Sequence, residues 1–246
     1  MTVVHYAGLS DVGRVRLKNE DAWYGDREQG VFLVSDGIGG HQAGEVAARV
    51  VADLLPGRLA EAVCGADSLD DPTVIQRARD AVAGLSGSMR DEAERRPSLS
   101  GMGATVAALL VKAGHGLILH LGDSRVYLLR GGHLQLLTTD HTLAQFLVES
   151  GVVAPEQASQ HPGRCRLTQY VGMSGEAKPG AQILNLQSND RLLLCTDGLS
   201  GAVDIDELRE ALSTAQDPES ACRRLIDAAN SAGGGDNVTV LVVQIA

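Results

Sequence analysis

The sequence contains two similar stretches, Val31-Phe-Leu-Val-Ser-Asp-Gly37 and Leu192-Leu-Leu-Cys-Thr-Asp-Gly198. Each is an apolar run followed by a hydroxyl residue, an aspartate and a glycine, which is typical of a buried strand that ends in a turn. A strand end aims its aspartate rigidly, and the glycine lets the main chain turn sharply or expose its carbonyl. Either stretch alone is also an ordinary β-turn. Because the chain has both, together with further acidic turns, we interpret them as parts of one shared site.

Other short apolar runs predict further strands along the chain. They lie at residues 3–9, 104–111, 117–121, 126–130, 133–137, 182–186 and 237–245. Strands that follow one another directly, such as 117–121 and 126–130, predict antiparallel hairpins. Helical segments come in pairs rather than one after each strand, which disfavours a doubly wound parallel sheet. The sequence therefore predicts an α+β fold in which helices pack outside antiparallel sheets.

The helical segments have recognisable boundaries. An apolar residue at every fourth position in 46–54 predicts a helix that Pro56-Gly57 ends. A second apolar stripe occupies residues 74–89, and Asp71-Pro72 before it provides an N-cap and a first-turn proline. Asp217-Pro218 is expected to open a later helix in the same way.

Composition excludes several classes of protein. The 246 residues carry 21 Lys and Arg against 31 Asp and Glu, a net charge of −10 that disfavours a nucleic-acid binder. The aromatic share of 3% also leaves few rings for stacking bases. No apolar run approaches the roughly 18–20 residues of a membrane span, no signal peptide is recognisable, and no Cys-x-x-Cys pair occurs. Without an interdomain linker, residues 1–246 are expected to form a single, cytoplasmic and reduced domain.

Three further acidic turns extend the shared site. They are Asn19-Glu20-Asp21, Gly122-Asp123-Ser124-Arg125 and Gly233-Gly234-Gly235-Asp236-Asn237. Taken singly, Asp123 fits a hairpin turn, and the glycines before Asp236 are either a flexible loop or a place where the main chain approaches an ion closely. Together they predict an oxygen-only cation site of the kind that Mg²⁺ and Mn²⁺ prefer, whereas no His or Cys cluster has zinc spacing.

A pair of divalent cations would explain why these carboxylates converge. Converging aspartates without a metal repel one another and have raised pKa values, and two cations remove that conflict. Such a pair also generates a hydroxide near neutral pH and clamps a phosphoryl group. Arg16, five residues before Asp21, lies on a strand-like segment and can grip phosphate oxygens with its guanidinium fork. We interpret Arg14, on the same segment, as a solvated surface arginine.

Six ordered motifs resemble those of type 2C metal-dependent Ser/Thr protein phosphatases, in particular the compact bacterial branch. They are Arg16-Leu-Lys-Asn-Glu-Asp21, Ser35-Asp-Gly-Ile-Gly-Gly40, Gly101-Met-Gly-Ala-Thr105, Gly122-Asp-Ser-Arg125, Cys195-Thr-Asp-Gly-Leu199 and Gly235-Asp-Asn-Val-Thr239. The resemblance covers nearly the whole chain. It implies a four-layer α-β-β-α sandwich with two central antiparallel sheets and the metals at one end.

The resemblance also implies a role for each matching residue. Asp36 would bridge two Mn²⁺ or Mg²⁺ ions, with Asp197 and Asp236 on one ion and the Gly37 carbonyl on the other. Arg16 would be catalytic and bind the substrate phosphate. Glu20 and Asp21 would contact the ions through water. Asp123, together with Asp197, would help to hold a third ion.

Three positions depart from the motifs or leave a role open. Eukaryotic members have a histidine two residues after the bridging aspartate as a proposed general acid, where this chain has Ile38. His41 matches bacterial relatives and is one candidate for that acid, with water as the simpler alternative. Residues 141–179 match the flap beside the active site, which influences substrate choice. Relatives often carry an arginine in the flap at the position of Gln169.

These observations lead to one principal hypothesis and two alternatives. The principal one is hydrolysis of phosphoserine and phosphothreonine in proteins by a metal-bridging hydroxide, without a phospho-enzyme intermediate. The enzyme would oppose a bacterial Ser/Thr kinase and would be a monomer. One alternative is an interaction module that binds a partner through the flap and uses metals only for stability. The other is a metallohydrolase of small phosphoesters.

Overall fold

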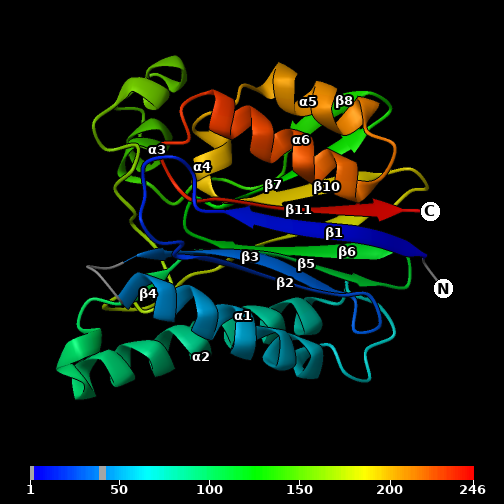
Figure 1. Ribbon diagram of the computed structural model, residues 1–246. Helices are drawn as coiled ribbons and strands as arrows, with labels where there is room; N and C mark the ends of the chain where they lie inside the picture. Colours follow the sequence, from blue (N-terminus) through cyan, green and yellow to red (C-terminus); the bar gives the residue numbers. More distant parts are fainter. Residues whose placement is uncertain (1–2, 39–42) are drawn as a thin grey trace.

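The computed structural model describes residues 3–38 and 43–246. Two antiparallel sheets lie face to face, with helices on both outer surfaces (Figure 1). The first sheet has the order β1 (Val4–Asp11), β11 (Val238–Ile245), β10 (Arg191–Cys195), β7 (Arg125–Arg130) and β8 (His133–Leu136). The second has the order β2 (Asp21–Asp26), β3 (Val31–Ile38), β5 (Val106–Lys112), β6 (His115–Leu121) and β9 (Gly180–Asn185), with β4 (Gly103–Ala104) paired to β3. The expected four-layer sandwich is confirmed.

The helices form the two outer layers. α1 (Ala43–Ala62) and α2 (Pro72–Arg95) cover the second sheet, whereas α5 (Ile205–Thr214) and α6 (Pro218–Ser231) cover the first (Figure 1). Shorter helical elements lie in the connections, namely η1 (Pro97–Leu99), α3 (Leu143–Glu149), η2 (Pro155–Gln160) and α4 (Asp197–Ser200). The expected N-caps are present: Asp71 accepts a hydrogen bond from Thr73 N at the start of α2, and Asp217 forms a capping box with Ser220 at the start of α6.

The two quoted stretches are strands buried on both faces. In β3, Val31 and Leu33 pack towards the helices, while Phe32 and Val34 pack between the sheets. β10 alternates in the same way and contributes Leu192 and Leu194 to the space between the sheets. Because successive side chains of a strand point to opposite faces, a continuous apolar run is what a central strand of this sandwich needs.

Two local predictions are wrong. Strands β6 and β7 do not form a hairpin: β6 pairs with β5 and β9, whereas β7 pairs with β10 and β8 in the other sheet. The turn around Asp123 is therefore a crossover between sheets, made possible by Gly122, which has a φ of 115° and whose α-carbon faces Thr105. The first helix also continues through Pro56 to Ala62, because the flanking Leu55 and Leu59 are fully buried and this packing outweighs the hydrogen bond lost at the proline.

A third expectation is wrong at the N-terminal loop. Residues 12–20 form turns rather than a strand, so Arg14 and Arg16 are not placed on one face by strand periodicity. The glycine stretch before Asp236 approaches this loop: Arg14 N donates a hydrogen bond of 2.8 Å to Gly234 O. A Cβ on Gly234 would lie 2.7 Å from Arg14 Cγ, so glycine is required for this contact. The Arg14 side chain itself is exposed, as expected, with an ion pair of 3.4 Å to Asp11.

Candidate active site

Acidic residues from both sheets meet at one end of the sandwich. Asp36 near the end of β3 lies opposite Asp21 on β2 in the antiparallel register. Asp197 follows β10 as the first residue of α4, and its carboxyl group is close enough to that of Asp36 for each to shift the pKa of the other. Asp123 in the crossover interacts electrostatically with Asp36, and Asp236 before β11 interacts electrostatically with Asp197. Residues far apart in the sequence are thus brought together as expected.

The cluster has a high concentration of negative charge in a region shielded from water. Burial, followed by repulsion from Asp21, Asp197 and Asp123, raises the pKa of Asp36 well above its ordinary value. Burial and the nearby Asp197 raise the pKa of Asp123 to about 7, and burial likewise raises the pKa of Asp21 to about 7. Since like charges disfavour ionisation of their neighbours, each of these carboxylates opposes ionisation of the others.

Thr105 fixes the position of Asp36. The hydroxyl of this buried threonine accepts a hydrogen bond of 2.9 Å from Asp36 N, and Thr105 N donates one of 2.8 Å to Asp36 O. The same hydroxyl lies 2.6 Å from the Ser124 hydroxyl, directly beside Asp123. Thr105 therefore links the main chain of Asp36 to the hydroxyl of Ser124, the residue next to Asp123. Sequence reasoning quoted it only as part of a motif, although a threonine at the start of a buried strand is a usable signal.

A second pair of hydroxyls holds Asp21. Thr196 Oγ1 donates a hydrogen bond of 2.8 Å to Asp21 Oδ2, and Thr239 also bonds this carboxyl group. Thr239 N donates to Thr196 Oγ1 at 3.0 Å, which ties β10 to β11 at this point. These hydrogen bonds favour the charged form of Asp21 and oppose the effect of burial.

Asn237 positions the loop that carries Arg16. Its amide nitrogen donates hydrogen bonds of 2.9 Å to Val12 O and 2.8 Å to Lys18 O, and its oxygen accepts one of 2.8 Å from Glu20 N. All three of these hydrogen bonds serve one loop, and the side chain is buried. This role was missed by sequence reasoning because the partners lie more than 200 residues away, as in the 217-residue separation from Glu20.

Arg16 reaches the cluster, but it contacts a carboxylate. Its Nη2 donates to Asp236 Oδ2 at 2.8 Å, and both side chains are more than one-third exposed. Arg16 would have to exchange this partner for a phosphate if both residues have the roles that the sequence predicts. An exposed ion pair of this kind contributes little stability, so breaking it requires little free energy.

The donor set fits divalent cations. The Gly37 carbonyl and the Glu20 carboxylate face common space above Gly44, because a Cβ on Gly44 would lie 2.7 Å from Glu20 Oε2 and 3.0 Å from Gly37 O. Gly37 itself is confined, since a Cβ there would overlap Gly44 O. Carboxylate and carbonyl oxygens are the ligands that hard cations prefer, and positive ions would relieve the repulsion around Asp36.

The cluster is not arranged as a complete metal site. Within residues 3–38 and 43–246, no group of three or more His, Cys, Asp or Glu side chains is positioned to hold an ion by itself. Asp236 is paired with Arg16, and the predicted ligands also include a main-chain oxygen, that of Gly37.

The remaining sequence predictions concern the acid and the flap. His41, the candidate general acid, lies outside the described residues. Ile38 is half-buried at the end of β3 and pairs with Gly103. Gln169 accepts a hydrogen bond of 2.8 Å from Lys178 N, so it fixes the main chain at the C-terminal end of the flap.

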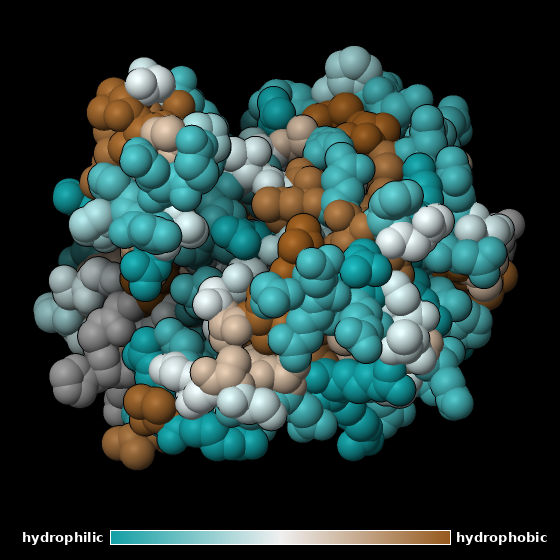
Figure 2. Space-filling model, turned by 90° about the horizontal axis from the view of Figure 1, so that it is seen from above, coloured by the Kyte–Doolittle hydropathy of each residue, from teal (hydrophilic) through white to brown (hydrophobic). Residues whose placement is uncertain are grey.

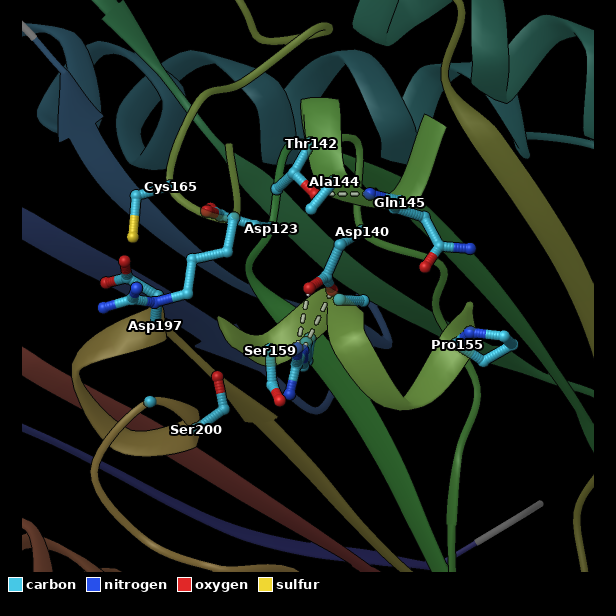
Figure 3. Close-up of a pocket in the computed structure, with 14 residues that line it drawn as sticks. Asp123, Asp140, Thr142, Ala144, Gln145, Pro155, Ser159, Cys165, Asp197 and Ser200 are labelled. Atoms are coloured by element: carbon cyan, nitrogen blue, oxygen red, sulfur yellow. Dashed lines mark hydrogen bonds and ion pairs between the residues drawn. The ribbon is translucent and has the colours of Figure 1, made fainter. Parts of the chain in front are cut away.

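A pocket of about 410 Å³ lies beside the cluster, between residues 141–165 and α4. From above, the surface is hollowed between the part that carries α3 and the part that carries α5 and α6 (Figure 2). Asp123 and Asp197 line this pocket, and Asp140 faces into it from the start of the flap (Figure 3). Arg125 grips Asp140 with two hydrogen bonds of 2.9 and 2.7 Å, which hold the flap to β7.

Comparison with known proteins identifies the family of this chain. The model of the protein phosphatase 2C family matches residues 13–239, and the chain belongs to this family. In the described part of the chain, no helix combines the length and the apolar character needed to cross a membrane.

Individual bacterial phosphatases are similar over the whole chain. The serine/threonine protein phosphatase PstP of Mycobacterium tuberculosis is 38% identical over 243 residues, which cover 99% of this chain but 45% of PstP. The serine/threonine phosphatase stp of Listeria monocytogenes is 32% identical, with 98% and 96% covered. The solved catalytic domain of PstP, in complex with two manganese ions, superposes with a TM-score of 0.83 at 35% identity and covers 100% of this chain and 99% of that one. The chain thus spans less than half of PstP but nearly all of stp.

Proposed function

We propose that this protein hydrolyses phosphoserine and phosphothreonine in proteins, with divalent cations bound at the acidic cluster. The observation that carries the proposal is the group of buried carboxylates around Asp36. These carboxylates repel one another, and bound cations would relieve that repulsion. Support comes from the family and from the PstP domain that holds two manganese ions. Mn²⁺ and Mg²⁺ both suit this donor set.

Each acidic residue has a proposed place. Asp36 would contact both ions, because it is central in the cluster, with Asp197 and Asp236 on one ion and the Gly37 carbonyl on the other. Glu20 and Asp21 would contact the ions through water. Asp123, together with Asp197, would hold a third, weaker ion. Thr105 and Thr196 would hold Asp36 and Asp21 in these places through the hydrogen bonds described above.

The reaction would need no covalent intermediate on the protein. When bound, the cation pair activates water as the nucleophile and neutralises charge on the phosphoryl oxygens. Arg16 would leave Asp236 and grip two phosphate oxygens, which orients the phosphoryl group for in-line attack. Asn237 would keep Arg16 within reach by fixing its loop at both ends. A proton from His41 or from water would complete departure of the alcohol.

The substrates would be phosphoproteins, including targets of a Ser/Thr kinase. The pocket beside the cluster opens to the flap, so residues on both sides of a phosphorylated side chain can lie between α4 and residues 141–165. We infer a monomeric enzyme whose substrate preference depends on the flap.

Turnover measurements test this proposal against the two alternatives. Mn²⁺-dependent hydrolysis of p-nitrophenyl phosphate is expected, together with faster hydrolysis of a phosphothreonine peptide than of nucleotides. D36N and D236N should each abolish turnover, R16A should chiefly raise KM, and D206N, at a carboxylate 82% exposed on α5, is the matched control that should leave the rate unchanged. Metal binding without turnover would favour an interaction module, and a preference for nucleotides would favour a small-molecule phosphoesterase.

A further inference from the structure

A second cavity, of about 570 Å³, lies on the outer face of the molecule away from the acidic cluster. One wall is α2, from Gln76 to Arg90, and the other is the end of the flap, residues 175–179. Its lining has three cationic side chains, Arg79, Arg90 and Lys178, against two acidic ones, Asp80 and Glu176. The lining is therefore net positive, whereas the chain as a whole has ten more acidic than basic residues. The volume is in the range of pockets that bind small ligands.

Arg79 stands out among these cations because it has no partner. Within residues 3–38 and 43–246, it makes no hydrogen bond or ion pair, and its Nε is buried with no acceptor. A buried donor without an acceptor destabilises the folded protein. The nearest acid along the helix, Asp80, accepts instead from Gln76 Nε2 at 2.8 Å. The arginine is therefore available to a ligand from outside the chain.

The other two cations are held only loosely by acids. Arg90 contacts Asp91 at 3.1 Å and Lys178 contacts Glu176 at 3.7 Å, and each of these side chains is at least 36% exposed. Exposed ion pairs contribute little stability, so they compete weakly with a bound anion. Arg90 also donates a long hydrogen bond of 3.4 Å to Gly175 O, which places its guanidinium between the two walls of the cavity.

The walls of the cavity are fixed by hydrogen bonds. Gly172 N donates to the buried Ser86 Oγ at 2.9 Å, which attaches the flap to α2. Lys178 N donates to Gln169 Oε1 at 2.8 Å, which shapes the turn that lines the cavity. Small residues, Ala83 and Gly87, leave the space open on the helix side. The cavity is thus a preformed feature of the fold.

We propose that this cavity is an anion site, in which the Arg79 guanidinium binds a phosphate or carboxylate group of a small organic ligand. A guanidinium fork matches both kinds of oxyanion, and the terminal nitrogens of Arg79, unlike its buried Nε, supply the donors at the cavity that this residue lines. Arg90 and Lys178 add positive charge at the rim. Because the cavity joins α2 to the last residues of the flap, a bound anion also connects these two elements.

The test uses the full chain without divalent metal, so that the acidic cluster repels anions and does not compete. Isothermal titration of the protein in EDTA with inorganic phosphate, and separately with succinate, should show saturable binding of at least one probe. Saturation by phosphate alone identifies a phosphate-bearing ligand, and saturation by succinate alone identifies a carboxylate-bearing one. Absence of saturation with both by about 10 mM would overturn the proposal.

Variants locate the binding. R79Q should weaken binding at least tenfold, whereas R77Q is the matched control, since Arg77 is an exposed arginine of α2 that does not line the cavity. R16A should bind as the parent does, and loss of binding in R16A would assign the anion to the acidic cluster instead. If R79Q does not fold, A83E provides a second test: it places a carboxylate four residues from Arg79, and this internal partner should abolish binding. Unchanged affinity in R79Q or A83E contradicts the site.

Discussion

Replacing Asp123 by asparagine should stabilise the metal-free protein at alkaline pH. The carboxyl group is 9% exposed, and burial together with Asp197 and Asp140 raises its pKa from 3.8 to about 7. At about 1.36 kcal/mol for each pH unit, this increase corresponds to roughly 4 kcal/mol of destabilisation once the group is ionised. Asparagine has nearly the same shape and no charge, so D123N should recover up to about 4 kcal/mol at pH 8.

The sign of the effect fixes its dependence on pH. The folded state binds the Asp123 proton more tightly than the unfolded state does, so the destabilisation is absent below about pH 4 and complete above about pH 7. Urea unfolding of both proteins in EDTA, followed by circular dichroism at pH 4, 6 and 8, measures the difference. D206N is the control, because that carboxylate is 82% exposed.

Two outcomes would refute this reasoning. A D123N protein less stable than the parent at pH 8 would show that Asp123 is not destabilised by burial and repulsion. A gain that is as large at pH 4 as at pH 8 would assign the effect to packing rather than to charge. With saturating Mn²⁺, the advantage of D123N should shrink or reverse, because a bound cation favours the aspartate.

Three further predictions follow from the hydrogen bonds around the site. N237A removes three hydrogen bonds to the loop that holds Arg16, so it should lower the free energy of unfolding by about 1–3 kcal/mol and raise KM for p-nitrophenyl phosphate. An unchanged KM would contradict the positioning role. T105V keeps the shape of the buried side chain but loses the hydroxyl that holds Asp36, so kcat should fall more than KM rises, and kinetics equal to the parent's would argue against the link. R125K keeps the charge but cannot form both bonds to Asp140, and faster limited proteolysis within residues 141–165 is expected, with R164K as the control.

Local sequence determines the strands and caps that build this fold. The runs before Asp36 and Asp197 are apolar at every position because both faces of β3 and β10 are buried, and this pattern is readable without a structure. The caps at Asp71 and Asp217 are equally local, since each side chain bonds an amide two or three residues away. The strand β2 was not predicted, because its residues Asp21–Asp26 show no apolar alternation at the edge of the sheet.

The sequence also predicted which carboxylates would meet, but their surroundings depend on contacts between distant segments. Arg16 and Asp236 are 220 residues apart, and nothing in either segment indicates that they form an ion pair. The same holds for the separation of β6 from β7, since Gly122 allows either a hairpin or a crossover and only the packing of two sheets selects the latter. In the sequence, Arg79 is an ordinary polar position of a predicted helix. Only the folded chain places residues 175–179 opposite it to form a cavity. Periodicity and capping act within a few residues, whereas burial and charge pairing depend on which segments the folded chain brings together.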